Sequence, residues 1–208
     1  MRIVCISDTH TKHQKASVPD GDLLIHAGDI CHFGKDKDVL HDFNHWIGRL
    51  PHPHKIVIAG NHDKILERDP DPTSNFIQNA HYLKDEFIEL EGLRIWGSPA
   101  TPWFRGAAFN YHRGEEIAKI WSLIPDKVDI LITHGPPHGI LDRTWFGLRV
   151  GCKDLRKRVE EIKPRLHIFG HIHENAGRLK KNQTEYINAS LVNWRFKLKN
   201  PAQVINLS

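Results

Sequence analysis

The sequence has few cysteines, and their spacing pairs none of them. Cys5, Cys31 and Cys152 are the three cysteines among 208 residues. An odd number of widely separated cysteines argues against a disulfide framework and against a Cys-x-x-Cys zinc site. We therefore expect a protein of a reducing compartment, in which Cys31 is a small buried hydrophobic residue and not a nucleophile.

The sequence also lacks a long apolar run. No stretch approaches the roughly 20 apolar residues that a membrane-spanning helix needs. The segment from Met1 to Asp8 enters a strand-like pattern and does not form the long apolar region of a signal peptide. We expect a soluble cytoplasmic protein with no membrane partner.

Runs of like charge are missing as well. The formal net charge is +4, from 29 Lys and Arg residues against 25 Asp and Glu residues, and no five basic residues follow one another. A basic balance suits an anionic substrate, but scattered charges do not predict a groove for nucleic acid. Nucleic acid is therefore not an expected partner, and formation of a homodimer is left open.

Histidine is the residue in excess, with 16 copies. His52 and His54 alternate with prolines, so we expect them on a surface loop. The histidines of greater interest belong to five short motifs, each of which follows an apolar strand-like run. These motifs are Asp8-Thr9-His10, Gly28-Asp29, Gly60-Asn61-His62-Asp63, Thr133-His134-Gly135 and Gly170-His171-Ile172-His173.

Strand-like and helical patterns alternate along the chain, and a length of 208 residues suits one α/β domain over residues 1–208. Helices are expected over residues 39–50, 64–68, 115–122 and 152–162. Strands are expected over residues 3–6, 23–27, 55–59, 87–90, 93–96, 128–133, 166–170, 178–181, 184–187 and 203–207. Residues 69–74 are expected to form a surface loop, and residues 97–110 a long aromatic loop. This order predicts two packed sheets flanked by helices.

The ends of the strands are where ligands distant in the sequence can meet, because these ends converge on one crevice in an open α/β sheet. Side chains alternate along an extended segment, so Asp8 and His10 are expected on one side. The same reasoning applies to His171 and His173. Each motif alone has a simpler explanation, such as a capped strand end or a surface pair. Their joint occurrence favours a metal centre.

The donor types indicate which ions suit this centre. Gly28 allows a tight turn that directs Asp29 inward, where its carboxylate can bridge two ions. Asn61 offers a neutral oxygen, and His134 and His171 offer imidazoles. This mixed oxygen and nitrogen set suits Mn, Fe, Zn or Ni better than Ca.

The five motifs together resemble those of the calcineurin-type metallophosphoesterases, and they extend from Ser7 to His173. Within that superfamily, Trp96-Gly97-Ser98-Pro99, Thr101-Pro102-Trp103-Phe104 and Thr133-His134-Gly135-Pro136-Pro137 are similar to the small metallophosphoesterase-domain-containing (239-like) subfamily. The resemblance implies a four-layer α/β/β/α sandwich that holds two divalent ions, with manganese favoured. It implies two ligand sets that share one residue: Asp8, His10, Asp29 and His173 around one ion, and Asp29, Asn61, His134 and His171 around the other.

Two ions roughly 3.5 to 4 Å apart can share a water and lower its pKa, which predicts a metal-bound hydroxide as the nucleophile. His62 is not assigned to an ion, so it is the candidate to stabilise the phosphoryl oxygens or to protonate the leaving group. Asp63 is the candidate to orient His62, and it also precedes the helix expected at 64–68, whose dipole it could stabilise.

Small phosphodiesters, cyclic nucleotides among them, are the expected substrates, because no separate capping domain is evident. Trp103, Phe104 and Trp145 could stack on a base, although core packing is the interpretation that we favour. Arg105, Arg143 and Arg149 are surface charges by default and could meet a phosphate. The alternatives are a phosphomonoesterase or nucleotide pyrophosphatase with the same centre, or a non-catalytic metal-binding interaction scaffold.

Overall fold

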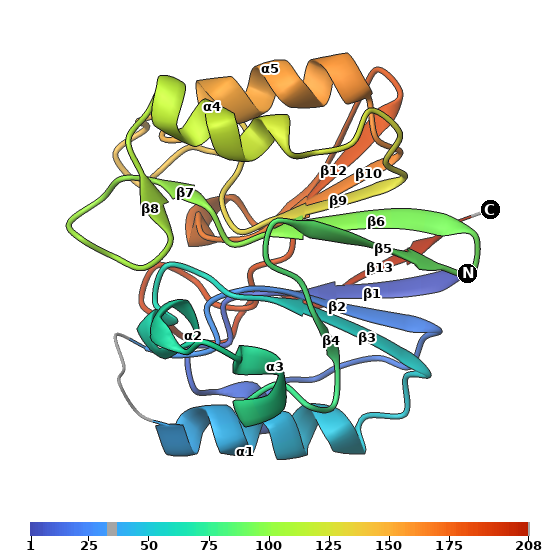
Figure 1. Cartoon of the computed structure of the whole chain (residues 1–208). Helices are drawn as coiled ribbons and strands as arrows, with labels where there is room; N and C mark the ends of the chain where they lie inside the picture. The colour runs from blue at the N-terminus through green and yellow to red at the C-terminus, as the bar shows by residue number, and fades with distance from the viewer. Residues whose placement is uncertain (33–36, 208) are drawn as a thin grey trace.

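Two β-sheets face each other and helices cover their outer sides in the computed structural model, which describes residues 1–32 and 37–207 (Figure 1). The five-stranded sheet has the order β13-β1-β2-β3-β4 and the six-stranded sheet the order β11-β12-β10-β9-β6-β5. The first sheet consists of β1 (Arg2–Ile6), β2 (Leu23–Ala27), β3 (His54–Ile58), β4 (His81–Tyr82) and β13 (Gln203–Asn206). The second consists of β5 (Glu86–Leu90), β6 (Leu93–Ser98), β9 (Ile130–Thr133), β10 (Leu166–Phe169), β11 (Gly177–Lys181) and β12 (Thr184–Asn188).

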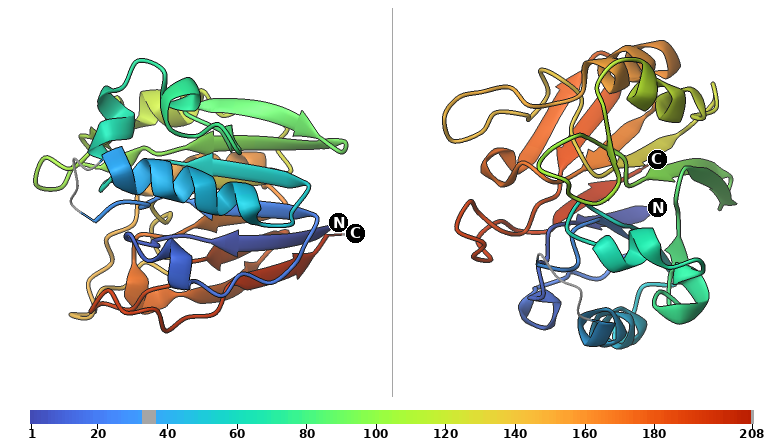
Figure 2. Two further views of the ribbon diagram at one scale, coloured as in Figure 1. Left: turned by 90° about the horizontal axis from the view of Figure 1, so that it is seen from below. Right: turned by 60° about the vertical axis from the view of Figure 1, so that its left-hand side comes forward.

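The helices are divided between the two outer faces (Figure 2). On the side of the five-stranded sheet lie α1 (Lys37–Arg49), α2 (Lys64–Arg68), α3 (Pro72–Asn75) and the short 3-10 helix η1 (His13–Lys15). On the side of the six-stranded sheet lie α4 (Glu115–Ser122) and α5 (Lys153–Ile162). Another 3-10 helix, η2 (His173–Asn175), and the short pair β7 (Thr101–Pro102) and β8 (Asn110–Tyr111) lie near the loops at one end. This arrangement confirms the predicted four-layer sandwich.

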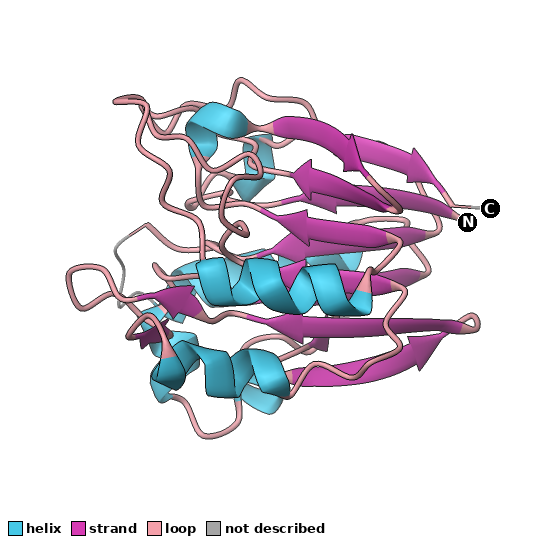
Figure 3. Ribbon diagram, turned by 90° about the horizontal axis from the view of Figure 1, so that it is seen from above, coloured by secondary structure: helices cyan, strands magenta, loops and turns pink. Residues whose placement is uncertain are grey.

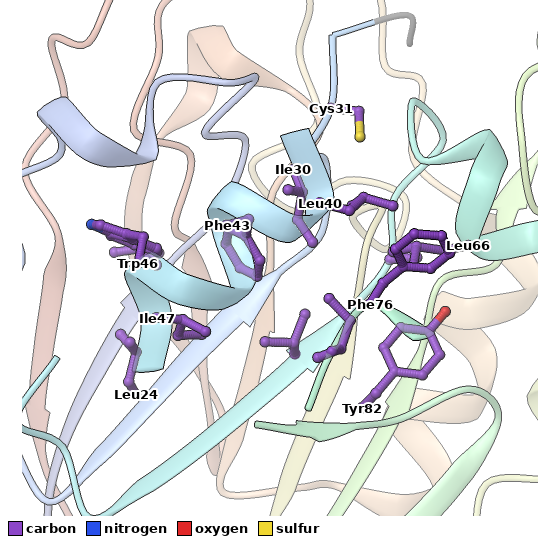
Figure 4. Close-up of a cluster of buried hydrophobic side chains, with 14 of the residues drawn as sticks. Leu24, Ile30, Cys31, Leu40, Phe43, Trp46, Ile47, Leu66, Phe76 and Tyr82 are labelled. Carbon is purple, nitrogen blue, oxygen red and sulfur yellow. The ribbon is translucent and has the colours of Figure 1, made fainter. Parts of the chain in front are cut away.

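The central strands are apolar throughout because both of their faces are buried. In β1, Ile3 and Cys5 face the other sheet, whereas Val4 and Ile6 face α1. Figure 4 shows the second of these layers, in which Phe43 of α1 packs above the sheet with its apolar neighbours. Cys31 is buried as predicted.

Most of the predicted elements lie within two residues of their observed bounds, and several local expectations are wrong. Residues 72–75 form α3 inside the expected loop, because Pro72 starts a helical turn and Asp71 accepts from the Ser74 amide at 3.1 Å. The short strands β4, β7 and β8 were not expected, and His54, expected on a surface loop, is the first residue of β3. His52 is buried, not on the surface, and its Nε2 donates to the Pro19 carbonyl at 2.9 Å.

None of the helices in the described part of the chain combines the length and apolar character required to cross a bilayer.

Candidate metal centre

The five motifs meet at one end of the molecule. Strands β1, β2 and β3 are parallel to one another, and so are β6, β9 and β10, and each sheet presents the carboxyl ends of these strands at the same edge (Figure 3). Four of the motifs lie at the ends of β1, β2, β9 and β10, and a fifth strand, β3, leads into Gly60 and Asn61. Residues far apart in sequence are therefore placed around one centre, as the strand pattern predicted.

Asp8, His10 and His173 form the first cluster of donor atoms, which lie within 4.8 Å of one another. His173 Nε2 is 3.3 Å from Asp8 Oδ1 and 3.3 Å from His10 Nε2. His10 Nδ1 donates to the Cys31 carbonyl at 2.9 Å, which fixes the ring so that Nε2 faces inward.

Asp29, His134 and His171 form the second cluster, whose donor atoms also lie within 4.8 Å of one another. His134 Nδ1 donates to the Ala27 carbonyl at 2.9 Å, so its Nε2 faces the centre. That nitrogen is 3.0 Å from Asn61 Oδ1, which adds an amide oxygen to the cluster.

The Asp29 carboxylate lies between the two clusters. Its Oδ2 is 3.7 Å from His10 Nε2, and its Oδ1 is 3.3 Å from His134 Nε2. Buried carboxylates and imidazole nitrogens that face the centre are typical ligands of first-row divalent ions. A backbone carbonyl that binds the other ring nitrogen, as at His10 and His134, is typical of such ligands too. The residues present thus fit a pair of such ions, and the Asp29 carboxylate would be within reach of both.

Burial sets the charge of these histidines. It lowers the pKa of His10 to about 4 and that of His171 to about 3, so that both imidazoles are neutral at neutral pH and carry a lone pair for an ion. Burial also lowers the pKa of His134, but the Asp29 carboxylate outweighs it and raises that pKa to about 9. The buried carboxylate therefore attracts positive charge to the centre.

The backbone at the donors is not extended, and the expectation that side-chain alternation brings Asp8 and His10 together is wrong. Their φ angles are 53° and 40°, Asp29 has a φ of 59° and His171 a φ of 69°. All four lie in the left-handed region, which residues other than glycine rarely adopt. Sharp turns after the strands, and not alternation along them, direct these side chains inward; such strain is typical of functional sites.

Two glycines leave the space that the carboxylates occupy. A Cβ on Gly60 would overlap Asp29 Oδ1, and a Cβ on Gly170 would overlap Asp8 Oδ2 and Ser7 Oγ. Glycine is required at these positions because the neighbouring strand end approaches so closely.

His62 lies outside the Asp8 cluster and the Asp29 cluster, but its ring lies beside His10 and His32, and donor atoms of these three histidines are within 4.8 Å of one another. Its backbone amide donates to Asp29 Oδ1 at 2.9 Å, and its Nε2 is 3.8 Å from Asp29 Oδ2. Its ring centroid is 4.8 Å from that of His10. The side chain lines the adjacent cavity, which is the position that its predicted role requires.

Asp63 is fully buried, and its carboxylate accepts three backbone amides. These come from Ile30 at 3.2 Å, Cys31 at 2.8 Å and Gly60 at 2.8 Å. Asp63 stands at the N-terminus of α2 but makes no side-chain capping hydrogen bond there. These three hydrogen bonds hold the loops after β2 and β3 together. Orientation of His62 by Asp63 stays a prediction.

A cavity of about 560 Å³ opens beside the donors. Asp29, Asn61 and His62 lie at its base, and its walls include Trp103 and Phe104. These two side chains and Trp145 are 54%, 58% and 68% exposed, so the expected core packing of these aromatics is wrong.

Two residues at the centre were missed by the sequence reasoning. The Phe196 ring packs edge-on against His10 and His173, with centroids 4.9 and 5.2 Å apart. His32 lies parallel to His62 at 6.1 Å. The sequence could have indicated His32, because it lies three residues after Asp29. Phe196 belongs to a C-terminal loop that has no motif to mark it.

Comparisons with known proteins agree with this geometry. The family model described as calcineurin-like phosphoesterase matches residues 1–175. Human metallophosphoesterase domain-containing protein 1 is 41% identical, over 99% of this chain and 71% of its own length. A UPF0046 protein of Caenorhabditis elegans is 40% identical, over 93% of this chain and 70% of its own length.

Among solved structures, a phosphopantetheinyl hydrolase from Mycobacterium tuberculosis superimposes with a TM-score of 0.63 over 93% of this chain and 90% of its own. Its sequence is 16% identical, so it supports the fold alone.

Proposed function

The chain belongs to the calcineurin-like phosphoesterase family, and from that premise we propose that it is a metal-dependent phosphodiesterase of small substrates, cyclic nucleotides among them. The observation that carries the proposal is the pair of donor clusters, with the Asp29 carboxylate between them and a cavity beside them. We further propose manganese as the preferred ion and the cytoplasm as the compartment, which the three free cysteines favour.

Seven side chains would hold the two ions. They are Asp8, His10, Asp29, Asn61, His134, His171 and His173. When bound, the ions would supply Lewis acidity that activates water and neutralises phosphoryl charge. The protein residues keep the donor atoms in place through the carbonyl contacts of His10 and His134.

His62 would act on the substrate directly. It reaches the cavity from the side of Asp29, so that a phosphoryl group at the donors would lie beside its ring. A neutral imidazole can donate one hydrogen bond to a phosphoryl oxygen, and a protonated one can give a proton to the leaving oxygen. The burial that lowers the pKa of His62 favours the neutral form in the metal-free protein.

The cavity walls support a diester in preference to a bare monoester. A volume of about 560 Å³ exceeds the space that a phosphate requires, and Trp103, Phe104 and Phe196 offer apolar surface for substituents. Lys64, Arg105 and Arg113 also line the cavity and favour the second candidate, a phosphomonoesterase or nucleotide pyrophosphatase. The complete donor set argues against a non-catalytic scaffold.

Steady-state hydrolysis of bis-p-nitrophenyl phosphate and p-nitrophenyl phosphate, with added Mn²⁺, tests the proposal. We expect the diester to be the better substrate. Asp29→Ala should abolish turnover and metal retention, because it removes the carboxylate that lies between the two clusters, whereas the exposed Asp20→Ala should change neither. Metal content is measured on the same samples.

Faster cleavage of the monoester would favour the second candidate. Bound metal without cleavage of either ester in the unmodified protein would support the interaction scaffold.

A further inference from the structure

Three loops surround the mouth of the cavity, and we call residues 103–113, 141–151 and 193–199 the rim loops. Each contributes to the cavity wall, and they leave the same end of the molecule, opposite the two termini (Figure 1, Figure 3). Arg113 donates to the Val150 carbonyl at 2.6 Å, which joins the first loop to the second. The rings of Trp145 and Trp194, 5.4 Å apart, join the second loop to the third. The rim loops thus form one continuous surface.

The rim loops expose large apolar side chains. Of the six tryptophans in the chain, Trp103, Trp145 and Trp194 are exposed, and all three lie on the rim loops. Phe146 is 86% exposed and Leu148 is 64% exposed, on the two sides of a turn at Gly147. A concentration of exposed apolar groups on one surface is the mark of a contact site.

The same loops concentrate positive charge. Their basic residues are Arg105 and Arg113 in the first loop, Arg143 and Arg149 in the second, and Arg195, Lys197 and Lys199 in the third. All seven are exposed. The single acidic residue of the rim loops, Asp142, is buried and pairs with Arg149 at 2.9 Å. The rim loops therefore carry a net charge of +6, whereas the whole chain carries +4, which leaves the remainder at −2.

We propose that the rim loops dock on an anionic phospholipid surface and place the cavity mouth against the membrane. Tryptophan rings suit the boundary between headgroups and acyl chains, because the acyl side is apolar and the headgroup side is hydrated. Arginine and lysine beside them are attracted to anionic headgroups. Phe146 and Leu148, at the tip of the second loop, are the side chains that insert.

Two other partners are less compatible with this surface. A second copy docked through the same loops would place like charges opposite each other, which is costly. A single-stranded nucleic acid needs free ring faces for stacking. Here the Arg195 guanidinium already lies 4.4 Å from the Trp194 ring centre, the Arg105 guanidinium lies 5.1 Å from that of Phe104, and Leu148 has no ring.

This docking is peripheral and needs no membrane-spanning helix, although it replaces the expectation of no membrane partner. It does not depend on the proposed phosphodiesterase activity. Phe146, Leu148, Arg195 and Lys197 are not among the side chains that line the cavity in the described part of the structure. Substitutions at these positions should therefore leave hydrolysis of bis-p-nitrophenyl phosphate unchanged, so that failure of docking and failure of catalysis can be told apart.

Vesicle flotation with the unmodified full chain tests the proposal. We expect the protein to float with vesicles of phosphatidylcholine and phosphatidylglycerol at about 0.1 M salt and not with phosphatidylcholine alone. Binding should weaken markedly at about 1 M salt, because the screening length falls to roughly 3 Å.

Paired substitutions separate the rim loops from the rest of the surface. Phe146→Ser with Leu148→Ser should lower the partition coefficient about tenfold or more, because both insertable side chains are lost. Leu123→Ser, at a residue that is 56% exposed outside the rim loops, should leave it within about twofold. Lys197→Glu should lower binding, whereas Lys180→Glu on β11 should not.

The proposal is overturned if the unmodified protein does not float with anionic vesicles, or if Leu123→Ser impairs binding as strongly as the paired rim substitution. It is also overturned if a labelled oligothymidylate binds the rim and the vesicles do not, which would assign the surface to nucleic acid. A dimer in sedimentation that Leu148→Ser dissociates, without vesicle binding, would assign it to a second copy.

Discussion

At the scale of single residues, the ring nitrogen that faces the centre decides what each histidine can do. His10 and His134 use Nδ1 to bind a carbonyl and keep Nε2 for an ion. His62 has its amide tied to Asp29, while its ring lies at the cavity. These different hydrogen-bond partners fit the different roles that we propose for the neighbouring imidazoles.

His62→Ala should lower kcat for bis-p-nitrophenyl phosphate by about 10²- to 10⁴-fold, because a positioned proton donor or hydrogen-bond donor is lost. The bound metal should remain, since His62 is not one of the seven proposed ligands. Metal analysis and steady-state kinetics on the same samples check this, with the exposed His81→Ala as the matched control. Loss of metal equal to that of Asp29→Ala would refute the division of roles.

At the scale of elements, the turns after the strands are the decisive feature. The loops after β2 and β3 converge on Asp63, whose carboxylate accepts amides from Ile30, Cys31 and Gly60. Burial, followed by the nearby Asp29 charge, raises the pKa of Asp63 to about 7 in the metal-free protein. One buried carboxyl group thus holds two ligand-bearing loops in register.

Asp63→Ala should destabilise the fold by about 3 kcal/mol or more, because three buried amides lose their acceptor. Asp63→Asn keeps an acceptor oxygen and should cost less. Urea unfolding of the two variants measures the difference, and calorimetric titration with Mn²⁺ should show weaker binding for the alanine variant. Equal stability of the alanine variant and the unmodified protein would show that these bonds do not hold the loops.

At the scale of the whole molecule, the packed layers bury polar side chains that belong to neither donor cluster. His167 on β10 is fully buried beneath α5, and its Nε2 lies 2.9 Å from Thr133 Oγ1. Because that hydroxyl donates to the Gly135 carbonyl at 2.8 Å, His167 donates through Nε2 and leaves Nδ1 without a hydrogen-bond partner among the described residues. Burial lowers the pKa of His167 to about 3.

The metal-free protein should therefore lose stability as the pH falls below about 6.5, the pKa of an unfolded histidine. Below that pH, His167 is protonated in the unfolded chain but stays neutral in the folded protein until the pH approaches 3. The contribution of neutral His167 to the free energy of unfolding is therefore fully present above pH 6.5 and is lost as the pH falls. The loss is about 1.4 kcal/mol per pH unit for each such histidine.

Urea unfolding after chelation, at about pH 7 and pH 5, measures this loss. His167→Gln should reduce the difference between the two pH values by about 2 kcal/mol, whereas the exposed His45→Gln should leave it unchanged. The prediction is wrong if His167→Gln retains the full pH dependence.

The sequence by itself determined the layers and pointed to the candidate donors. Apolar runs such as Ile3 to Ile6 specify strands buried on both faces, and helical spacing specifies α4 and α5 to within one residue. The motifs identify Asp8, Asp29 and His134 as candidates because each directly follows a strand. These patterns depend on residues that are close in the sequence, so they can be recognised without knowing how the chain packs.

Tertiary structure alone decided how the donors converge and what surrounds them. The left-handed turns at Asp8 and His171, the amide bonds of Asp63 and the approach of Phe196 all depend on contacts between segments distant in sequence. The same is true of charge, since basic residues that look scattered along the chain gather on the rim loops once the strands are packed. Sequence patterns report neighbours along the chain, whereas a binding surface is made of neighbours in space.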